Sequence, residues 1–194
     1  MSRAAKIALA AWIAVLVAFG GWVVYDFSRS DGGTPAIGGP FTLTDHNGKK
    51  VTEADFKGKP TLIYFGFTYC PDVCPTSLLL MQTAVEQLGK DADKRVNMVL
   101  ITIDPERDTP AVLKDYVGNF GPTIMGLTGS ADEIATAAKA YRVYYRKVEG
   151  KDGAPYLMDH SSIFYLLDKR GRFVKHFTHQ SKAEDIAAAI KPLL

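Results

Sequence analysis

Hydrophobic and polar positions divide most of the chain into short apolar runs separated by polar turns. The run from Thr61 to Phe67 is continuous, apolar and β-prone, which predicts a buried strand. Residues 76–88 follow with a mainly apolar helical face, which predicts a helix. A second buried strand is expected over residues 96–103. Strands and helices therefore alternate through the centre of the sequence.

The segments on either side carry turn and capping signals. Asn47-Gly48 separates two short runs, Phe41–Leu43 and Lys50–Val51, which predicts a hairpin. Thr109 followed by Pro110 is typical of a helix start. Further elements are expected as helices from Pro110 to about Val117, from Ser130 to about Ala140 and from Ser181 to about Ile190, an extended piece over 123–127, a β-prone run over 141–147, and a hairpin of 162–167 with 172–177. This order predicts a thioredoxin-like α/β sandwich over residues 41–194.

A different pattern marks the N-terminus. Residues 7–24 form an uninterrupted run of uncharged, largely apolar residues, long enough as a helix to span a bilayer core. Because Arg3 and Lys6 precede this run, the positive-inside rule places the N-terminus in the cytoplasm. We expect a transmembrane anchor over 1–25 and a Ser-, Gly- and Pro-rich tether over 26–40. The alternative is a cleaved signal peptide, although the run is long for one.

With either reading, the remaining domain is exported. In a bacterial chain this means the periplasmic side of the inner membrane, where free cysteines meet oxidising conditions. The composition is ordinary for a globular protein, with 47% hydrophobic and 23% charged residues and a formal charge of +2. Arg3 and Lys6 account for that excess, so the domain itself is balanced. A balanced domain without a basic stripe argues against nucleic-acid binding.

The only two cysteines, Cys70 and Cys74, lie between the first buried strand and the helix that follows it. A helix N-terminus favours thiolate over thiol, and the thiolate is the form that binds metals and attacks disulfides. At a spacing of four residues in a helix-like turn, both sulfurs can meet one target or bond to each other. Two chemistries are therefore open, a soft metal site and a reversible dithiol. A purely structural disulfide is disfavoured, because so short a loop removes little chain entropy.

A histidine is expected to join them. Ligands of open α/β sheets bind beyond the carboxyl ends of the parallel strands. If the strand that starts at Ser162 runs antiparallel to the first buried strand, Asp159 and His160 lie at this same edge. Two thiolates and one imidazole suit three-coordinate Cu(I) and accommodate Cu(II), whereas structural zinc sites have four protein ligands. The alternative for His160 is a hydrogen-bonded histidine at a strand start.

Several other polar residues have structural explanations beside functional ones. Asp72 is a turn residue or presents charge to the site, and Asp159 orients the imidazole or caps a turn. Asp104 and Asp108 are expected to hold their loop by local hydrogen bonds, with a site role second. The remaining histidines are expected in a hairpin or in solvent, and these are His46, His176 and His179.

Three motifs, in this order, resemble the Sco/SenC family of copper-binding cytochrome c oxidase assembly proteins. They are Tyr64–Pro75 (YFGFTYCPDVCP), Asp104–Pro110 (DPERDTP) and Asp159–Ser161 (DHS). The resemblance covers roughly residues 40–194. It implies that Cys70, Cys74 and His160 are copper ligands. It also implies that the protein supplies copper to the dinuclear copper site of cytochrome c oxidase subunit II, or reduces the cysteines of that site.

Two functions follow from these residues. A membrane-anchored metallochaperone would hold copper and pass it on by ligand exchange, without catalytic turnover. A thiol–disulfide reductase would use one cysteine to attack a partner disulfide and the other to resolve the mixed disulfide. A peroxidase is a remoter third. The expected partners are subunit II, other periplasmic copper chaperones or thioredoxin-like reductants, and the membrane, but no nucleic acid.

Overall fold

The computed structural model describes residues 12, 15–16, 19–21, 37–150 and 153–194. The chain divides into two compact units, 1–36 and 37–194, and the account below concerns the second. Most of the expected anchor and tether lies outside the described residues, although those described between 12 and 21 are helical. None of the helices within the described residues has the length and apolar character needed to cross a bilayer.

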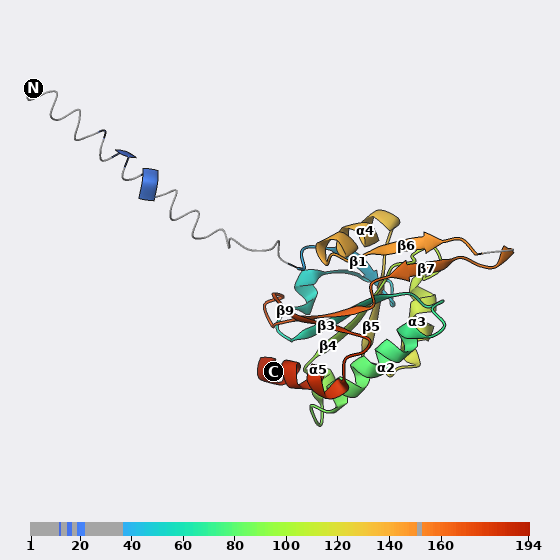
Figure 1. Cartoon of the computed structure of the whole chain (residues 1–194). Coiled ribbons are helices and arrows are strands. Elements are labelled where there is room, and N and C mark those ends of the chain that lie inside the picture. The colour runs from blue at the N-terminus through green and yellow to red at the C-terminus, as the bar shows by residue number, and fades with distance from the viewer. Residues whose placement is uncertain (1–11, 13–14, 17–18, 22–36, 151–152) are drawn as a thin grey trace, which may run out of the picture. The chain divides into compact units, whose positions relative to one another are not determined.

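A seven-stranded mixed sheet forms the centre of the domain (Figure 1). Its strand order is β2-β1-β5-β4-β3-β8-β9. The strands are β1 (Thr42–Asp45), β2 (Lys50–Thr52), β3 (Thr61–Gly66), β4 (Asn97–Thr102), β5 (Ile124–Thr128), β8 (Ile163–Leu167) and β9 (Phe173–Thr178). The central strands β3, β4 and β5 are parallel, and β8 pairs with β3 antiparallel. The carboxyl ends of β3 and β4 therefore share one edge with the start of β8, as the sequence predicted.

Helices cover both faces of this sheet. They are α2 (Val73–Glu86), α3 (Pro110–Gly118), α4 (Ala131–Ala140) and α5 (Ala183–Ile190), with short 3-10 turns η1 (Glu53–Phe56), η2 (Ala92–Lys94) and η4 (Lys191–Leu193). Figure 1 shows α4 over one face and α2 with α5 over the other. A separate two-stranded ribbon, β6 (Tyr145–Val148) with β7 (Leu157–His160), extends beside the sheet.

Strand β3 shows why the core has two layers. Successive side chains of a strand point to opposite faces. Phe65 packs against Tyr141 at a centroid distance of 5.5 Å, on the side of α4. Tyr64 points the other way, where its hydroxyl meets Cys74 on α2. All six residues of β3 are buried, because helices or loops cover both faces. The continuous apolar run in the sequence has this cause.

The predicted turns and caps are largely confirmed. The Asn47-Gly48 turn joins β1 to β2, and Gly48 adopts a φ of +85° that favours glycine. The side chain of Thr109 caps α3 by accepting from the Val112 amide. Ser130 forms a capping box with Glu133 at the start of α4.

Two details of local structure differ from the expectation. Helix α2 begins at Val73, ahead of the expected residues 76–88, so its first turn already includes Cys74. The pairing of 157–160 with the β-prone run was not predicted, and it places His160 at the end of β7 rather than at the start of β8. The segment is short and has no alternation strong enough to identify a strand, so only its partner β6 reveals it.

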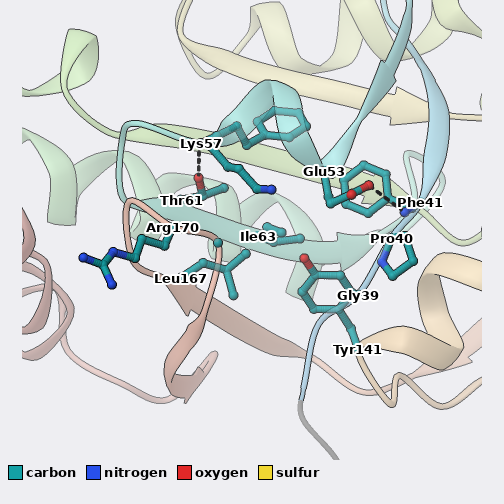
Figure 2. A pocket seen from close by; sticks show the side chains of 12 residues that line it. Gly39, Pro40, Phe41, Glu53, Lys57, Thr61, Ile63, Tyr141, Leu167 and Arg170 are labelled. Carbon is teal, nitrogen blue, oxygen red and sulfur yellow. Dashed lines mark hydrogen bonds between the residues drawn. The ribbon is translucent and has the colours of Figure 1, made fainter.

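A cavity of about 250 Å³ lies near the start of β3, at the opposite end of that strand from the cysteines. Figure 2 shows its apolar surfaces, which include Ile63, Leu167 and the ring of Tyr141. Neither cysteine nor His160 lines it. This cavity is therefore separate from the residues that the sequence predicts to bind a metal.

The packing of β4 predicts a sharp contrast between two leucines. Leu100→Ala should lower the free energy of unfolding by about 3 kcal/mol, because Leu100 is fully buried in the central sheet. Leu79 on α2 is 56% exposed, so Leu79→Ala should change the free energy of unfolding by less than about 0.5 kcal/mol. Urea unfolding followed by circular dichroism measures both. Equal losses for the two variants would contradict the assigned core.

Candidate metal centre

The two cysteines lie where β3 ends and α2 begins. Cys70 is half-buried in the intervening loop, and Cys74 is completely buried in the first turn of the helix. Both are free thiols. The backbone amide of Cys74 donates to Cys70 Sγ at 3.4 Å, so the helix N-terminus faces the outer sulfur. This is the placement that favours a thiolate at Cys70.

The inner sulfur packs tightly against the end of β3. A Cβ atom on Gly66 would lie 3.0 Å from Cys74 Sγ and 2.8 Å from a ring carbon of Tyr64, so a side chain here would force its neighbours apart. The hydroxyl of Tyr64 donates to Cys74 Sγ at 3.8 Å. Gly66 and Tyr64 lie on the same face of β3, and although both belong to the first motif, no role beside the cysteines was predicted for either. The alternation of that strand with the cysteines beyond it was the signal that could have found them.

His160 lies against this sulfur although the two residues are 86 positions apart in the chain. Its Nε2 atom is 3.7 Å from Cys74 Sγ. The imidazole contacts the ring of Phe67 edge-on at 5.7 Å and that of Tyr64 at 6.2 Å, and Nδ1 faces the Ser161 carbonyl at 3.2 Å. Ring packing therefore holds the imidazole in place. The predicted proximity is confirmed, and the role of His160 as a ligand stays a prediction.

The distance between these two donors fits a shared metal. Bond lengths of about 2.3 Å to sulfur and about 2.0 Å to imidazole, at the roughly 120° angle of a trigonal site, place the donors about 3.7 Å apart. Cys74 Sγ and His160 Nε2 already have that separation. No group of three or more His, Cys, Asp or Glu side chains among the described residues is already gathered as a metal site. Cys70 is the third predicted ligand.

The pKa values of the two thiols are shifted in opposite directions. The pKa of Cys70 lies well below the usual range, chiefly because the Cys74 thiol donates to its thiolate, with further support from His160 and the backbone amides of Cys74 and Asp72. The pKa of Cys74 is raised by the neighbouring Cys70 and by burial. The two thiols therefore titrate as a coupled pair, in which Cys70 is the more acidic member.

The motif loop, residues 103–109 between β4 and α3, contacts the cysteine loop, residues 67–72 between β3 and α2. Asp108 is buried and accepts hydrogen bonds from the Thr68 amide at 3.0 Å, the Thr68 hydroxyl at 2.6 Å and the Thr102 hydroxyl at 2.5 Å. Burial raises its pKa despite these donors. The expectation of local hydrogen bonds was therefore incomplete, because the Thr68 contacts cross 40 positions. Asp104 is buried as well and pairs with Arg107.

The other candidate residues lie outside the donor group. Asp159 is exposed and pairs with Arg146 at 3.4 Å, on the opposite face of β7 from His160, so it does not orient the imidazole. The Asp72 side chain makes no capping hydrogen bond, and its carbonyl accepts from Thr76. His46 accepts from the Gly126 amide, which confirms its place in the hairpin. The remaining two histidines, His176 and His179, are exposed.

The architecture and the site together define a class of protein, a thioredoxin-like α/β domain with two thiols and an imidazole at the carboxyl edge of its sheet. The sequence profile of the SCO1/SenC family matches residues 29–194. The chain therefore belongs to the SCO1/SenC family.

Individual relatives agree with this assignment. Protein sco1 of Schizosaccharomyces pombe is 46% identical over 160 residues, which are 81% of this chain and 61% of that protein. The mitochondrial SCO1 homolog 1 of Arabidopsis thaliana is 46% identical over 145 residues, 75% of this chain and 43% of that protein. The chain thus spans about half the length of these two relatives.

Two solved structures are similar throughout the domain. Bradyrhizobium japonicum ScoI, solved with copper bound, is 53% identical with a TM-score of 0.75, and the match covers 82% of this chain and 100% of that one. BsSco, described as a member of the Sco family of cytochrome c oxidase assembly proteins in which a disulfide switch was identified, is 29% identical with a TM-score of 0.65 and coverages of 84% and 95%.

The proton arrangement predicts how the thiols react. Because the pKa of Cys70 is lowered, its alkylation by iodoacetamide should already be fast at pH 7, and the rate should change little as pH rises further. Cys74→Ala removes the main donor to that thiolate, so the midpoint of the pH–rate profile should move upward by at least about one pH unit. Mass spectrometry of the labelled protein measures the rates. Preferential labelling of Cys74 in the wild type would contradict the assignment.

Proposed function

We propose that this protein is a copper metallochaperone that holds Cu(I) or Cu(II) between Cys70, Cys74 and His160. The observation that carries the proposal is the 3.7 Å approach of His160 Nε2 to Cys74 Sγ. Soft thiolates with one imidazole are a donor set that suits copper. The copper-bound structure of ScoI, 53% identical to this chain, supports the same metal.

Copper is the cargo of such a protein rather than a catalyst. Cys74 is the buried member of the proposed site, while Cys70 and His160 are half-buried, and we propose that a partner's thiolate approaches at Cys70. An incoming thiolate can replace the outer ligand first, so that transfer proceeds without a free ion. Cys74 has to lose its proton when the metal binds, and tight binding therefore weakens as pH falls.

The proposed recipient is the dinuclear copper site of cytochrome c oxidase subunit II. The description of BsSco as belonging to a family of cytochrome c oxidase assembly proteins supports this choice. Other periplasmic copper chaperones are proposed as donors of the metal, and thioredoxin-like proteins as reductants of the cysteines. Nucleic acid is not a proposed partner, because the charge of the domain is balanced.

The proposed location is the periplasmic side of the inner membrane, with a single membrane span. Residues 1–25 would form the anchor, 26–40 the tether and 41–194 the copper-binding domain. The apolar run after Arg3 and Lys6 supports this topology. A tether of this composition would leave the domain free to meet partners in the same membrane.

Removing the imidazole tests the ligand set. His160→Ala should weaken copper binding by at least about a hundredfold, since loss of a ligand costs more than the loss of an outer-sphere contact. His176→Ala, at an exposed histidine on β9, is the matched control and should bind as the wild type does. Titration of the reduced protein, followed by thiolate-to-Cu(II) absorption and by competition with a Cu(I) chelator, measures both. Equal binding by wild type and His160→Ala would exclude the three-ligand site.

A second candidate function is thiol–disulfide reduction, and the unequal pKa values of the two cysteines favour it. The Cys70 thiolate would attack a partner disulfide, releasing one partner thiolate and forming a mixed disulfide. Cys74, after losing its proton, would attack Cys70 Sγ and release the second partner thiolate. The partner gains two electrons, and this protein leaves with a disulfide. The disulfide switch identified in BsSco supports this possibility.

A reduction assay separates the two functions. We expect a peptide with a disulfide between two cysteines to be reduced once per protein molecule, and His160→Ala to retain this reaction. Cys74→Ser should accumulate the mixed disulfide through Cys70, which mass spectrometry detects. Rapid multiple turnover with a thioredoxin-type reductant would favour the reductase over the chaperone.

A further inference from the structure

The motif Asp104–Pro110 contributes none of the three proposed copper ligands. The loop between β4 and α3 carries Arg107, whose guanidinium lies among residues from three separate segments. Nε donates to the buried carboxylate of Asp104, and Nη1 donates to the backbone carbonyl of Tyr156 at 2.9 Å. Its central carbon is 3.8 Å from the ring centroid of Tyr156 and 4.6 Å from that of Tyr69.

These contacts reach both parts of the site. Tyr69 immediately precedes Cys70, and Tyr156 immediately precedes β7, which ends at His160. One planar cation therefore touches the segment that carries the outer sulfur and the strand that carries the imidazole. The Tyr156 hydroxyl also donates to Asp104 at 2.9 Å, so the same carboxylate fixes the cation and the ring it packs against.

Burying the Arg107–Asp104 ion pair costs free energy, which indicates that the pair has a role beyond closing the loop. The Asp104 side chain is only 3% exposed, and Nη2 of Arg107 is buried without a hydrogen-bond partner in the described part of the chain. Leaving a guanidinium donor unsatisfied is unfavourable. A fold that only needed to close this loop could use an apolar residue here. The guanidinium offers what an apolar residue cannot, which is hydrogen bonding in its plane and aromatic contact on its face.

We propose that Arg107 is the positioning residue of the copper site, a clamp that sets the separation between the Cys70 loop and the His160 strand. It does not touch the metal and acts through Tyr69 and Tyr156. Cys74 and His160 are already held together by the rings of Tyr64 and Phe67. Arg107 supplies the remaining constraint, which keeps the half-buried Cys70 within reach of the other two.

The inference rests on the proposed function only for its copper readout, and a metal-free readout tests it independently. The test variant is Arg107→Lys, which retains the charge beside Asp104 but loses the planar contact with both rings. The matched control is Arg170→Lys, in the β8–β9 turn at the far end of β3. A second variant, Tyr69→Leu, removes one clamped ring from an exposed position.

In the reduced, metal-free full-length protein in non-ionic detergent, hydrogen–deuterium exchange should rise about tenfold or more in Arg107→Lys at residues 68–72 and 156–161. Exchange in α5 should stay as in the wild type. Unchanged exchange at both site segments would overturn the proposal whatever the copper result. Acceleration throughout the domain, α5 included, would also overturn it, since this outcome describes general destabilisation.

Copper titration of the same samples gives the second readout. The Cu(I) dissociation constant should rise about tenfold or more in Arg107→Lys and in Tyr69→Leu, the range typical of groups that orient ligands. The thiolate-to-Cu(II) band should shift or weaken, while Arg170→Lys matches the wild type. Wild-type affinity and an unchanged band in Arg107→Lys would overturn the positioning role. If the wild type itself fails to bind copper, the proposed function fails, and the exchange measurement still decides whether Arg107 is a clamp.

Discussion

The contact between the His160 imidazole and the Cys74 sulfur is the interaction on which the site depends. It joins the end of β7 to the first turn of α2, and neither element pairs with the other by backbone hydrogen bonds. Aromatic rings hold the two elements together, because Phe67 and Tyr64 contact the imidazole edge-on and leave Nε2 directed at the sulfur. The absence of a side chain on Gly66 makes room for the sulfur at the end of β3. The donor pair is thus a product of core packing and inherits the rigidity of the sheet.

A second layer of contacts surrounds this rigid pair and belongs to the loop after β4. Asp108 accepts hydrogen bonds from Thr68, just before the cysteines, and Arg107 contacts residues next to Cys70 and before β7. Both are charged residues in largely buried surroundings, which is expensive unless the partners are well placed. Parallel pairing of β3 with β4 is what brings the two loops to one edge of the sheet. The fold and the motif loop therefore depend on the same strand order.

The sequence predicted the alternation of strands and helices, most of the turns and the edge at which the site lies, because apolar periodicity and capping residues are local signals. It also placed His160 beside the cysteines, since strand direction follows from topology. It could not place Asp159, which was expected either to orient the imidazole or to cap a turn and which pairs with Arg146 on the other face. That outcome depends on the register of β7 with β6, and β7 is too short to be recognised from its own residues. The role of Arg107 was equally hidden, since it arises from contacts with residues 38 to 49 positions away in the chain.

The three predicted ligands differ in burial, because Cys74 is buried whereas Cys70 and His160 are half-buried. Cys74 and His160 are held by packing, and the pKa of Cys70 is lowered while that of Cys74 is raised. Cys70 and His160 are both half-buried, and Cys70 follows the exposed ring of Tyr69. A site designed only to retain a metal would bury all its ligands and close the shell, as structural zinc sites do. One buried thiol beside a half-buried thiol and a half-buried imidazole instead favours exchange with another protein's sulfur, and both proposed functions need this property. The two functions differ in what is transferred to the partner. The metallochaperone transfers a copper ion and the reductase transfers two electrons, and only copper transfer needs His160.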